Sequence, residues 1–305
     1  WEMAGIVTPD PLPKFPDGFP KAFIEEFSRR TGRKILCNLP YSGTQVIHDY
    51  GREQEKTGAL IVYTSADSVC QIAAHEEIIP VGQLYEYCKI AREMLTGDLG
   101  VGRVIARPFI GTWPNYERTI RRHDFSLAPP RQTLLDALKE EGKDVIGVGK
   151  IYDIFEGQGV TETYSNQGNE KNMEKTIEIQ KKDFDGLCYV NLVDGDMIYG
   201  HRRDIEGYAG ALTRFDEQLG EFLANMRDDD MLMITADHGC DPGYTGTDHT
   251  REYVPCLIYG KEIKAGVNLH TRKGFADMAA TIAEALGSTY RGDGESFWGE
   301  IRNKR

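Results

Sequence analysis

The sequence lacks several features that would place it in a common structural or functional class. No hydrophobic run approaches the ~20 residues that a membrane span needs, and no cationic segment followed by an apolar one opens the chain. Low-complexity segments and internal repeats are also missing. With 305 residues, 40% hydrophobic and 28% charged, the chain is predicted to fold as one large or two ordinary globular domains.

Cysteine is scarce and scattered. No pair has the CxxC spacing of a thiolate zinc site, and most lie in apolar or strand-like contexts, which predicts reduced core residues in a cytoplasmic protein. The six are Cys37, Cys70, Cys88, Cys188, Cys240 and Cys256.

Basic residues are outnumbered, with 36 Lys and Arg against 48 Asp and Glu and a net charge of −12. Such a chain is a poor general binder of nucleic acid, so an anionic substrate would need a local basic pocket. We expect a small-molecule partner, no nucleic acid, no membrane and a monomer.

Three nucleotide and hydrolase motifs are absent as well. The glycines at 147–149 and 157–159 do not form a GxGxxG that opens a helix after a first strand, which disfavours a dinucleotide site. Neither the GxSxG turn of serine hydrolases nor the GxxxxGK[ST] loop of P-loop proteins occurs.

Strand-like and helix-like runs alternate along most of the chain, which predicts an α/β fold. Strands are expected at 59–65, 101–109, 144–149, 187–193, 231–236 and 255–259. Helices are expected at 20–31, 82–95, 132–142, 205–226 and 275–286. The helix at 205–226 has an apolar stripe at three- and four-residue steps, which we expect to face a sheet.

Two proline-rich segments divide the chain, one near residues 8–13 and one at 127–130. They predict an inserted cap domain over residues 9–126. The larger core is predicted to combine residues 1–8 with 127–305. All candidate metal ligands fall in this core.

The candidate metal ligands lie at or shortly after two predicted strand ends. The strand 231–236 ends in Asp237 and His238, and a glycine-rich loop then brings His249. The strand 187–193 ends in Asp194-Gly195-Asp196, and His201 follows. Carboxylates and imidazoles form a mixed ligand set for divalent cations, which favours metal-assisted phosphoryl transfer over a structural zinc site. The alternative is that these side chains only cap strand ends.

Neighbouring residues have plainer expected roles. Asp194 alternates with Asp196 along the predicted strand and is interpreted as structural, whereas Asp248 is expected to orient a neighbouring group. Asp204 is a natural N-cap for the long helix. Beside it, Arg202 and Arg203 contact either phosphate or nearby protein groups, the second being the commoner fate.

Further candidates suit recognition of a phosphorylated sugar. Ser65 and Asp67 follow a strand abruptly and either bind sugar hydroxyls or satisfy their own turn. Cations near the second hinge and at a strand end could form a phosphate clamp, with surface solvation as the alternative. These cations are Arg103, Arg107, Arg122 and Lys150.

Together these strings resemble the phosphopentomutase family of the alkaline phosphatase superfamily. The strongest are Asp196-Met-Ile-Tyr-Gly-His201-Arg-Arg-Asp204, Thr235-Ala-Asp237-His238-Gly and Gly246-Thr-Asp-His249-Thr-Arg-Glu-Tyr-Val-Pro255. The likeness extends through 42–44, 63–69, 102–109 and 122–124, and so covers essentially the whole chain. It implies a mainly parallel sheet core, an inserted cap and two Mn²⁺ ions, for which Mg²⁺, Co²⁺ or Zn²⁺ could substitute.

The resemblance also implies roles for residues. Asp196, His201 and His249 would hold one metal, and Asp237 and His238 would hold the other with a further Asp and a phosphorylated Thr. Ser65, Asp67, Arg122 and Lys150 would lie near the substrate, with Arg103 and Arg107 as weaker matches. The implied reaction interconverts ribose 1-phosphate and ribose 5-phosphate, or the deoxyribose pair, through a sugar bisphosphate that also serves as activator.

Two departures from the family pattern stand out. The family's first strand and its nucleophilic Thr would precede Trp1, so we expect the chain to begin inside a longer product. Gly195 stands where the family usually has Phe. Another superfamily mutase, a phosphatase and a non-catalytic metal-binding fragment therefore remain as alternative functions.

Overall fold

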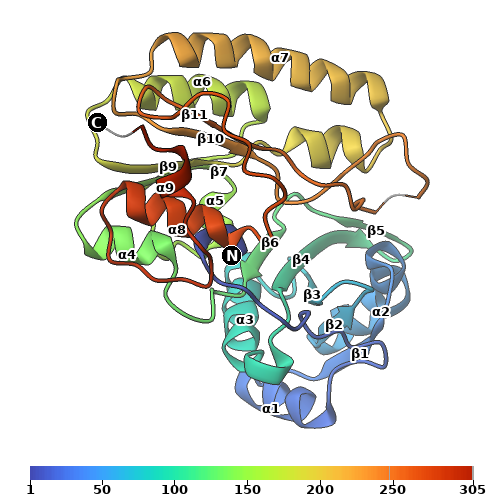
Figure 1. The fold of residues 1–305 in the computed structure, drawn as a ribbon. Coiled ribbons are helices and arrows are strands. Elements are labelled where there is room, and N and C mark those ends of the chain that lie inside the picture. The colour runs from blue at the N-terminus through green and yellow to red at the C-terminus, as the bar shows by residue number, and fades with distance from the viewer. Residues whose placement is uncertain (247, 304–305) are drawn as a thin grey trace. The chain divides into compact units, whose positions relative to one another are not determined.

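A computed structural model describes residues 1–246 and 248–303 (Figure 1). The chain separates into two compact units. The larger contains Trp1–Thr8 and Pro129–Arg305, and the smaller contains Pro9–Ala128. Within the described ranges, no helix is both long and apolar enough to cross a membrane.

The smaller unit is built on one mixed sheet. Its strands follow the order β1-β2-β3-β4-β5, and β6 pairs with β4. They are β1 (Ile35–Pro40), β2 (Leu60–Thr64), β3 (Val69–His75), β4 (Arg103–Thr112), β5 (Asn115–Arg118) and β6 (His123–Ser126). The helices are α1 (Lys21–Thr31), α2 (Gly43–Thr57) and α3 (Val81–Met94).

Both faces of this sheet are covered. In β2, Leu60 and Val62 belong to the hydrophobic cluster that includes residues of α1 and α3. The alternate residues Ile61 and Tyr63 pack in the cluster that includes α2. Because successive strand residues point to opposite faces, a strand covered on both sides is apolar throughout, and every residue of β2 is buried.

The larger unit carries two separate sheets. Three parallel strands follow the order β8-β7-β9, and two antiparallel strands form β10-β11. The strands are β7 (Asp144–Gly149), β8 (Glu162–Ser165), β9 (Gly186–Val190), β10 (Leu232–Thr235) and β11 (Cys256–Tyr259). The helices are α4 (Leu134–Glu140), α5 (Ile151–Ile154), α6 (Asn169–Gln180), α7 (Ile205–Ala224), α8 (Ala276–Ala285) and α9 (Trp298–Ile301).

The predicted α/β class is confirmed, and each predicted helix and strand has a counterpart. Several elements were not predicted, chiefly α2, α6, β1 and β3. The helices α2 and α6 are rich in polar residues, and several of their buried positions are not apolar (Gly51 and Gln54 in α2; Asn172, Thr176 and Gln180 in α6), so their apolar period is weak in the sequence. Neither β1 nor β3 has the strict alternation that identifies a strand.

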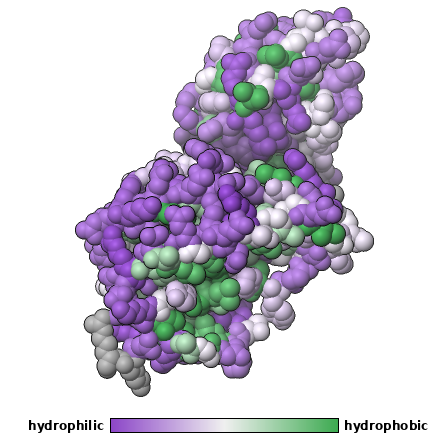
Figure 2. Space-filling view, turned by 90° about the horizontal axis from the view of Figure 1, so that it is seen from above, coloured by the Kyte–Doolittle hydropathy of each residue, from purple (hydrophilic) through white to green (hydrophobic). Residues whose placement is uncertain are grey.

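The expectation that the apolar stripe of α7 packs on a sheet is wrong. The helix packs mainly against α6 and the segment Gly195–Gly200, and none of its residues is buried. Leu212 is 57% exposed. The physical reason is the divided sheet, since β9 and β10 each end a sheet with one edge unpaired by any strand in the described ranges. Hydrophobic side chains also form an exposed area on the face that Figure 2 shows.

The helix α4 is tied to the hydrophobic cluster of the larger unit by a reciprocal cap. The Thr133 hydroxyl accepts from the backbone N–H of Asp136, and the Asp136 carboxylate accepts from the backbone N–H of Thr133 at 2.8 Å. Leu134, Leu135 and Leu138 then pack in the cluster. The cap therefore fixes where the helix begins, and with it the position of three core leucines.

We predict that Thr133→Ala destabilises the larger unit by about 1–2 kcal/mol, because the backbone N–H of Asp136 loses its acceptor and the Asp136 carboxylate loses the Thr133 hydroxyl as a donor. Urea unfolding followed by circular dichroism measures the change. Thr213→Ala, on exposed α7, is the matched control and should shift stability by less than about 0.5 kcal/mol. Equal effects of the two substitutions would contradict the cap's role.

Candidate metal centre

Asp196 does not lie at a strand end as predicted. The strand β9 stops at Val190, and Asp196 belongs to a π-helical segment, Gly195–Gly200. Asp194 precedes this segment, and its carboxylate accepts from the backbone N–H of Asn169 at 2.7 Å. Asn169 in turn accepts from the backbone N–H of Asp194 at 2.9 Å. Asp194 thus has the structural role expected of it, although the element is a helical turn.

The π-helical turn explains why Asp196 and His201 lie together. The backbone N–H of His201 donates to the carbonyl of Asp196 at 3.2 Å, the five-residue hydrogen bond that defines a π-helix. In an α-helix, residues five apart point about 140° away from each other. Here His201 Nε2 lies 3.1 Å from Asp196 Oδ1. Isolated π-helical turns are frequent at functional sites.

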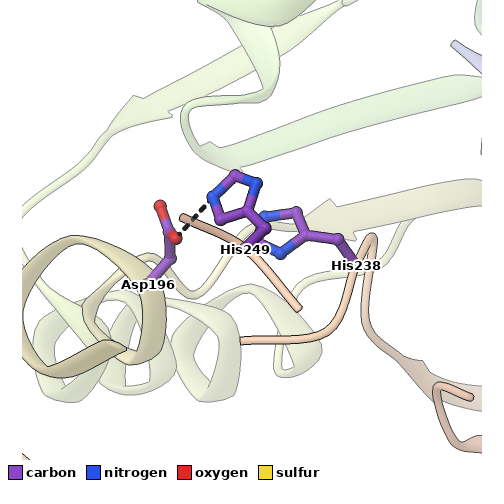
Figure 3. Close-up of side chains that lie close together, drawn as sticks. All are labelled: Asp196, His238 and His249. Carbon is purple, nitrogen blue, oxygen red and sulfur yellow. Dashed lines mark hydrogen bonds and ion pairs between the residues drawn. The ribbon is translucent and has the colours of Figure 1, made fainter. Parts of the chain in front are cut away.

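Two more histidines come from the segment after β10, and one of them contacts the same carboxylate. His249 Nε2 lies 2.9 Å from Asp196 Oδ1, the contact drawn as a dashed line in Figure 3. The His238 ring stacks on the His249 ring with centroids 3.6 Å apart. One ligand atom each from Asp196, His238 and His249 lies within 4.8 Å of the others. The structure therefore gathers residues that the chain separates widely.

This donor set fits a divalent cation. Two ligands bonded at about 2.1 Å and at right angles lie about 3 Å apart, which matches both distances from Asp196 Oδ1 to an imidazole nitrogen. The side chains are also accessible, since those of Asp196, His201 and His249 are 33%, 40% and 45% exposed. Imidazole and carboxylate together suit Mn²⁺, Co²⁺ or Zn²⁺.

Asp237 lies at the margin of this cluster. Its Oδ1 is 3.8 Å from His238 Nε2, and its side chain is 68% exposed. It is not part of the group formed by Asp196, His238 and His249. The assignment of Asp237 and His238 to a second metal therefore stays a prediction.

Lys150 is the one substrate candidate in the larger unit. It directly follows β7 and precedes α5, and its ammonium group lies 2.7 Å from the sulfur of Met197, the residue after Asp196. A sulfur is a weak acceptor for an ammonium group, so this contact leaves Lys150 able to bind a stronger anion. The structure thus places the positively charged side chain of Lys150 next to the π-helical turn that contains Asp196.

In the smaller unit, Ser65 and Asp67 satisfy their own turn. The backbone N–H of Asp67 donates to the Ser65 hydroxyl at 3.3 Å, and the carbonyl of Asp67 accepts from Val69. The sequence left open whether these residues bind sugar hydroxyls or satisfy their own turn, and these contacts are of the second kind. A contact of either side chain with a sugar stays a prediction.

Arg103 and Arg122 share one partner, the carboxylate of Asp124. Arg122 makes two hydrogen bonds to it, each 2.6 Å long, and Arg103 lies 3.4 Å away. The double hydrogen bond raises the pKa of the Arg122 guanidinium. Since both arginines neutralise one carboxylate, an excess of positive charge remains on this face.

The open pocket beside them was not predicted as a unit. Its lining includes Arg107, Arg118, Arg122 and Thr44. Tyr63 is fully buried, and its hydroxyl has no hydrogen-bond partner in the described part of the chain. Burial raises the pKa of this phenol, whereas the positive charges of the three arginines oppose the rise.

The first turn of α2 lies against Tyr63 and Arg118. A Cβ built on Gly43 would lie 3.0 Å from the Tyr63 hydroxyl and 3.0 Å from an Arg118 guanidinium nitrogen. Ser42, at the N-cap, makes no side-chain hydrogen bond to the helix. The sequence contained no signal for Tyr63 or Arg118, because tertiary packing alone brings β2, β5 and the first turn of α2 together.

Comparison with known proteins identifies the family. A model of the Metalloenzyme superfamily matches residues 130–290. A phosphopentomutase of Lachnoclostridium phytofermentans is 59% identical, covering 100% of this chain and 78% of the relative. Those of Carboxydothermus hydrogenoformans and Clostridioides difficile are 56% and 54% identical, each covering 99% of this chain and 78% and 77% of the relative. The chain belongs to the phosphopentomutase family.

Membership in the Metalloenzyme superfamily makes this phosphopentomutase-family chain metal-dependent, and residues 130–290 include every candidate ligand. The unusual Gly195 opens the π-helical turn. A Cβ at this position would meet only the ring of Tyr208, at 3.7 Å, so the site has room for a side chain.

We predict that Asp196→Asn weakens binding of Mn²⁺ more than about 100-fold, because one carboxylate oxygen contacts both imidazoles and an amide cannot supply its charge. Titration calorimetry, or the loss of the free-Mn²⁺ paramagnetic resonance signal, measures the affinity. Asp216→Asn, exposed on α7, should bind like the unmodified protein. Undiminished binding by Asp196→Asn would exclude Asp196 as a ligand.

Proposed function

We propose that this protein interconverts ribose 1-phosphate and ribose 5-phosphate, and the deoxyribose pair, as a phosphothreonine enzyme with two Mn²⁺ ions and a sugar bisphosphate activator. It is an isomerase of the phosphopentomutase type, as its relatives at 53–59% identity over nearly the full chain indicate. The observation that carries the proposal is this sequence identity together with the cluster of Asp196, His238 and His249.

The residues of the cluster fit their proposed roles as metal ligands. Asp196, His201 and His249 would hold one cation, and Asp237 and His238 would contribute to the other. Bound cations in such an enzyme lower the pKa of the attacking hydroxyl and neutralise charge on the phosphoryl group. Lys150, beside Met197, would add a positive charge that orients a phosphate oxygen.

The proposed phosphate-binding role of the smaller unit is supported by the pocket of Arg107, Arg118 and Arg122. The Arg107 side chain donates to Gln71 at 3.0 Å, and this bond leaves other guanidinium donors for a ligand. A phosphate oxygen would satisfy the buried Tyr63 hydroxyl and accept from the first N–H groups of α2. Arg103, Ser65 and Asp67 would then contact the sugar or its phosphate from the neighbouring strand ends.

We further propose a cytoplasmic monomer that acts on small molecules and binds neither nucleic acid nor membrane. Six free cysteines and the acidic net charge support this proposal. The competing functions are those of another mutase or a phosphatase of the same superfamily. The relatives named above are phosphopentomutases, which supports the pentose phosphate substrate.

We predict that the intact gene product, supplied with Mn²⁺ and a sugar bisphosphate, converts ribose 1-phosphate to ribose 5-phosphate. Conversion of 3-phosphoglycerate and hydrolysis of a generic phosphate ester should each be at least about 100-fold slower in kcat/KM. Removal of metal by a chelator should abolish the conversion, and Mn²⁺ should restore it. Preference for 3-phosphoglycerate, or release of inorganic phosphate as the main product, would overturn the proposal.

We predict that Arg107→Gln raises KM for ribose 5-phosphate about 10- to 100-fold, because a charged hydrogen bond to phosphate contributes about 1.5–3 kcal/mol. Tyr63→Phe should raise KM less, by about 3- to 10-fold, since it removes one neutral donor. Steady-state kinetics measures both. Arg30→Gln, whose side chain pairs with Glu26 on α1, is the control and should leave KM unchanged.

A further inference from the structure

Arg203 makes contacts that the proposed chemistry does not use. Its guanidinium donates to three backbone carbonyls of one loop, those of Asp241 at 2.6 Å, Asp248 at 2.9 Å and Gly246. The sequence left open whether Arg203 contacts phosphate or protein, and the structure assigns it to protein. An arginine can bind three carbonyls at once because its donors form a rigid planar fork.

These contacts join the two chain segments that supply the metal ligands. Arg203 lies two residues after His201, and the loop that it holds leads directly into His249. The loop is closed at its other end by a pair of backbone contacts between Gly239 and Thr250. It is further tied by the backbone N–H of Asp241, which donates to the Thr250 hydroxyl at 2.7 Å. Arg203 thus crosses from the π-helical turn to the interior of the closed loop.

The backbone aims this side chain at the loop. Arg203 has a φ of 58°, in the left-handed region, which is rare for a residue with a side chain. Its N–H donates to the carbonyl of Gly200 at 3.0 Å, and that of Asp204 donates to Tyr199 at 3.0 Å. Asp204 then caps α7 through the backbone N–H of Gly207 at 2.8 Å. The chain therefore reverses sharply between the π-helical turn and α7, with Arg203 at the reversal.

From this geometry we infer that Arg203 is a positioning residue for the metal centre. By holding the carbonyls of Asp241, Gly246 and Asp248, it keeps His249 beside Asp196 and His201 before any cation binds. The loop is otherwise held at its base, by the Gly239–Thr250 bridge and by the Thr250 hydroxyl, while the side chains of Asp241, Tyr244 and Asp248 are exposed. The expected effect of Arg203 on cation binding rests on the proposed metal centre. Its expected effect on the order of the loop does not, and can be measured in the metal-free protein.

The experiment compares Arg203→Ala and Arg203→Lys with Arg202→Ala in the intact protein. Arg202 is the adjacent residue, is exposed, and makes no hydrogen bond or ion pair within residues 1–246 and 248–303. Affinity for Mn²⁺ should fall about 10- to 100-fold in Arg203→Ala, the loss typical when a group that orients a ligand is removed. Arg203→Lys should be intermediate, because an ammonium group cannot span three carbonyls. Arg202→Ala should bind like the unmodified protein.

Hydrogen exchange on the metal-free protein separates this inference from the metal proposal. In Arg203→Ala, backbone amides of residues 240–250 should exchange at least about 10-fold faster, while β7 and α4 keep their protection. Exchange equal to that of Arg202→Ala would overturn the inference. If His249→Ala bound Mn²⁺ as tightly as the unmodified protein, the proposed metal centre would be overturned. The hydrogen-exchange rates of the loop amides would then decide by themselves whether Arg203 positions the loop.

Discussion

One carboxylate organises the candidate site of this protein. Asp196 Oδ1 lies within 3.1 Å of an imidazole nitrogen of His201 and within 2.9 Å of one of His249. Its negative charge lies beside two imidazole nitrogens, so a divalent cation would meet carboxylate and imidazole ligands together. The π-helical turn and the loop that Arg203 holds bring these three side chains together.

Two unusual backbone conformations make that convergence possible. The π-helical turn brings residues five apart onto one side, and the left-handed Arg203 reverses the chain directly after it. Both conformations are less favourable than a plain α-helix, and both are compensated by hydrogen bonds of the surrounding backbone and by the Asp204 cap of α7. Local strain next to a binding site is therefore part of how the site is preorganised.

The two units differ in how much of their structure is buried. The smaller has a sheet covered on both faces, with fully buried strands, an open basic pocket, and a buried Tyr63 hydroxyl that has no hydrogen-bond partner among the described residues. The larger holds the candidate metal ligands on loops and turns that follow the sheets, while its helix α7 keeps an incompletely buried apolar stripe. In many proteins a rigid scaffold provides stability, while accessible loops carry the binding and catalytic residues.

The α/β class, the main helices and strands, and the residue types of the candidate metal ligands could all be predicted from the amino-acid sequence. These depend on local periodicity and on side-chain chemistry, both of which are written in consecutive residues. Only the tertiary structure decided that Asp196 sits on a π-helical turn, that Arg203 binds carbonyls, and that Tyr63 meets Arg118. Each of these depends on contacts between segments far apart in the chain, which local pattern does not encode.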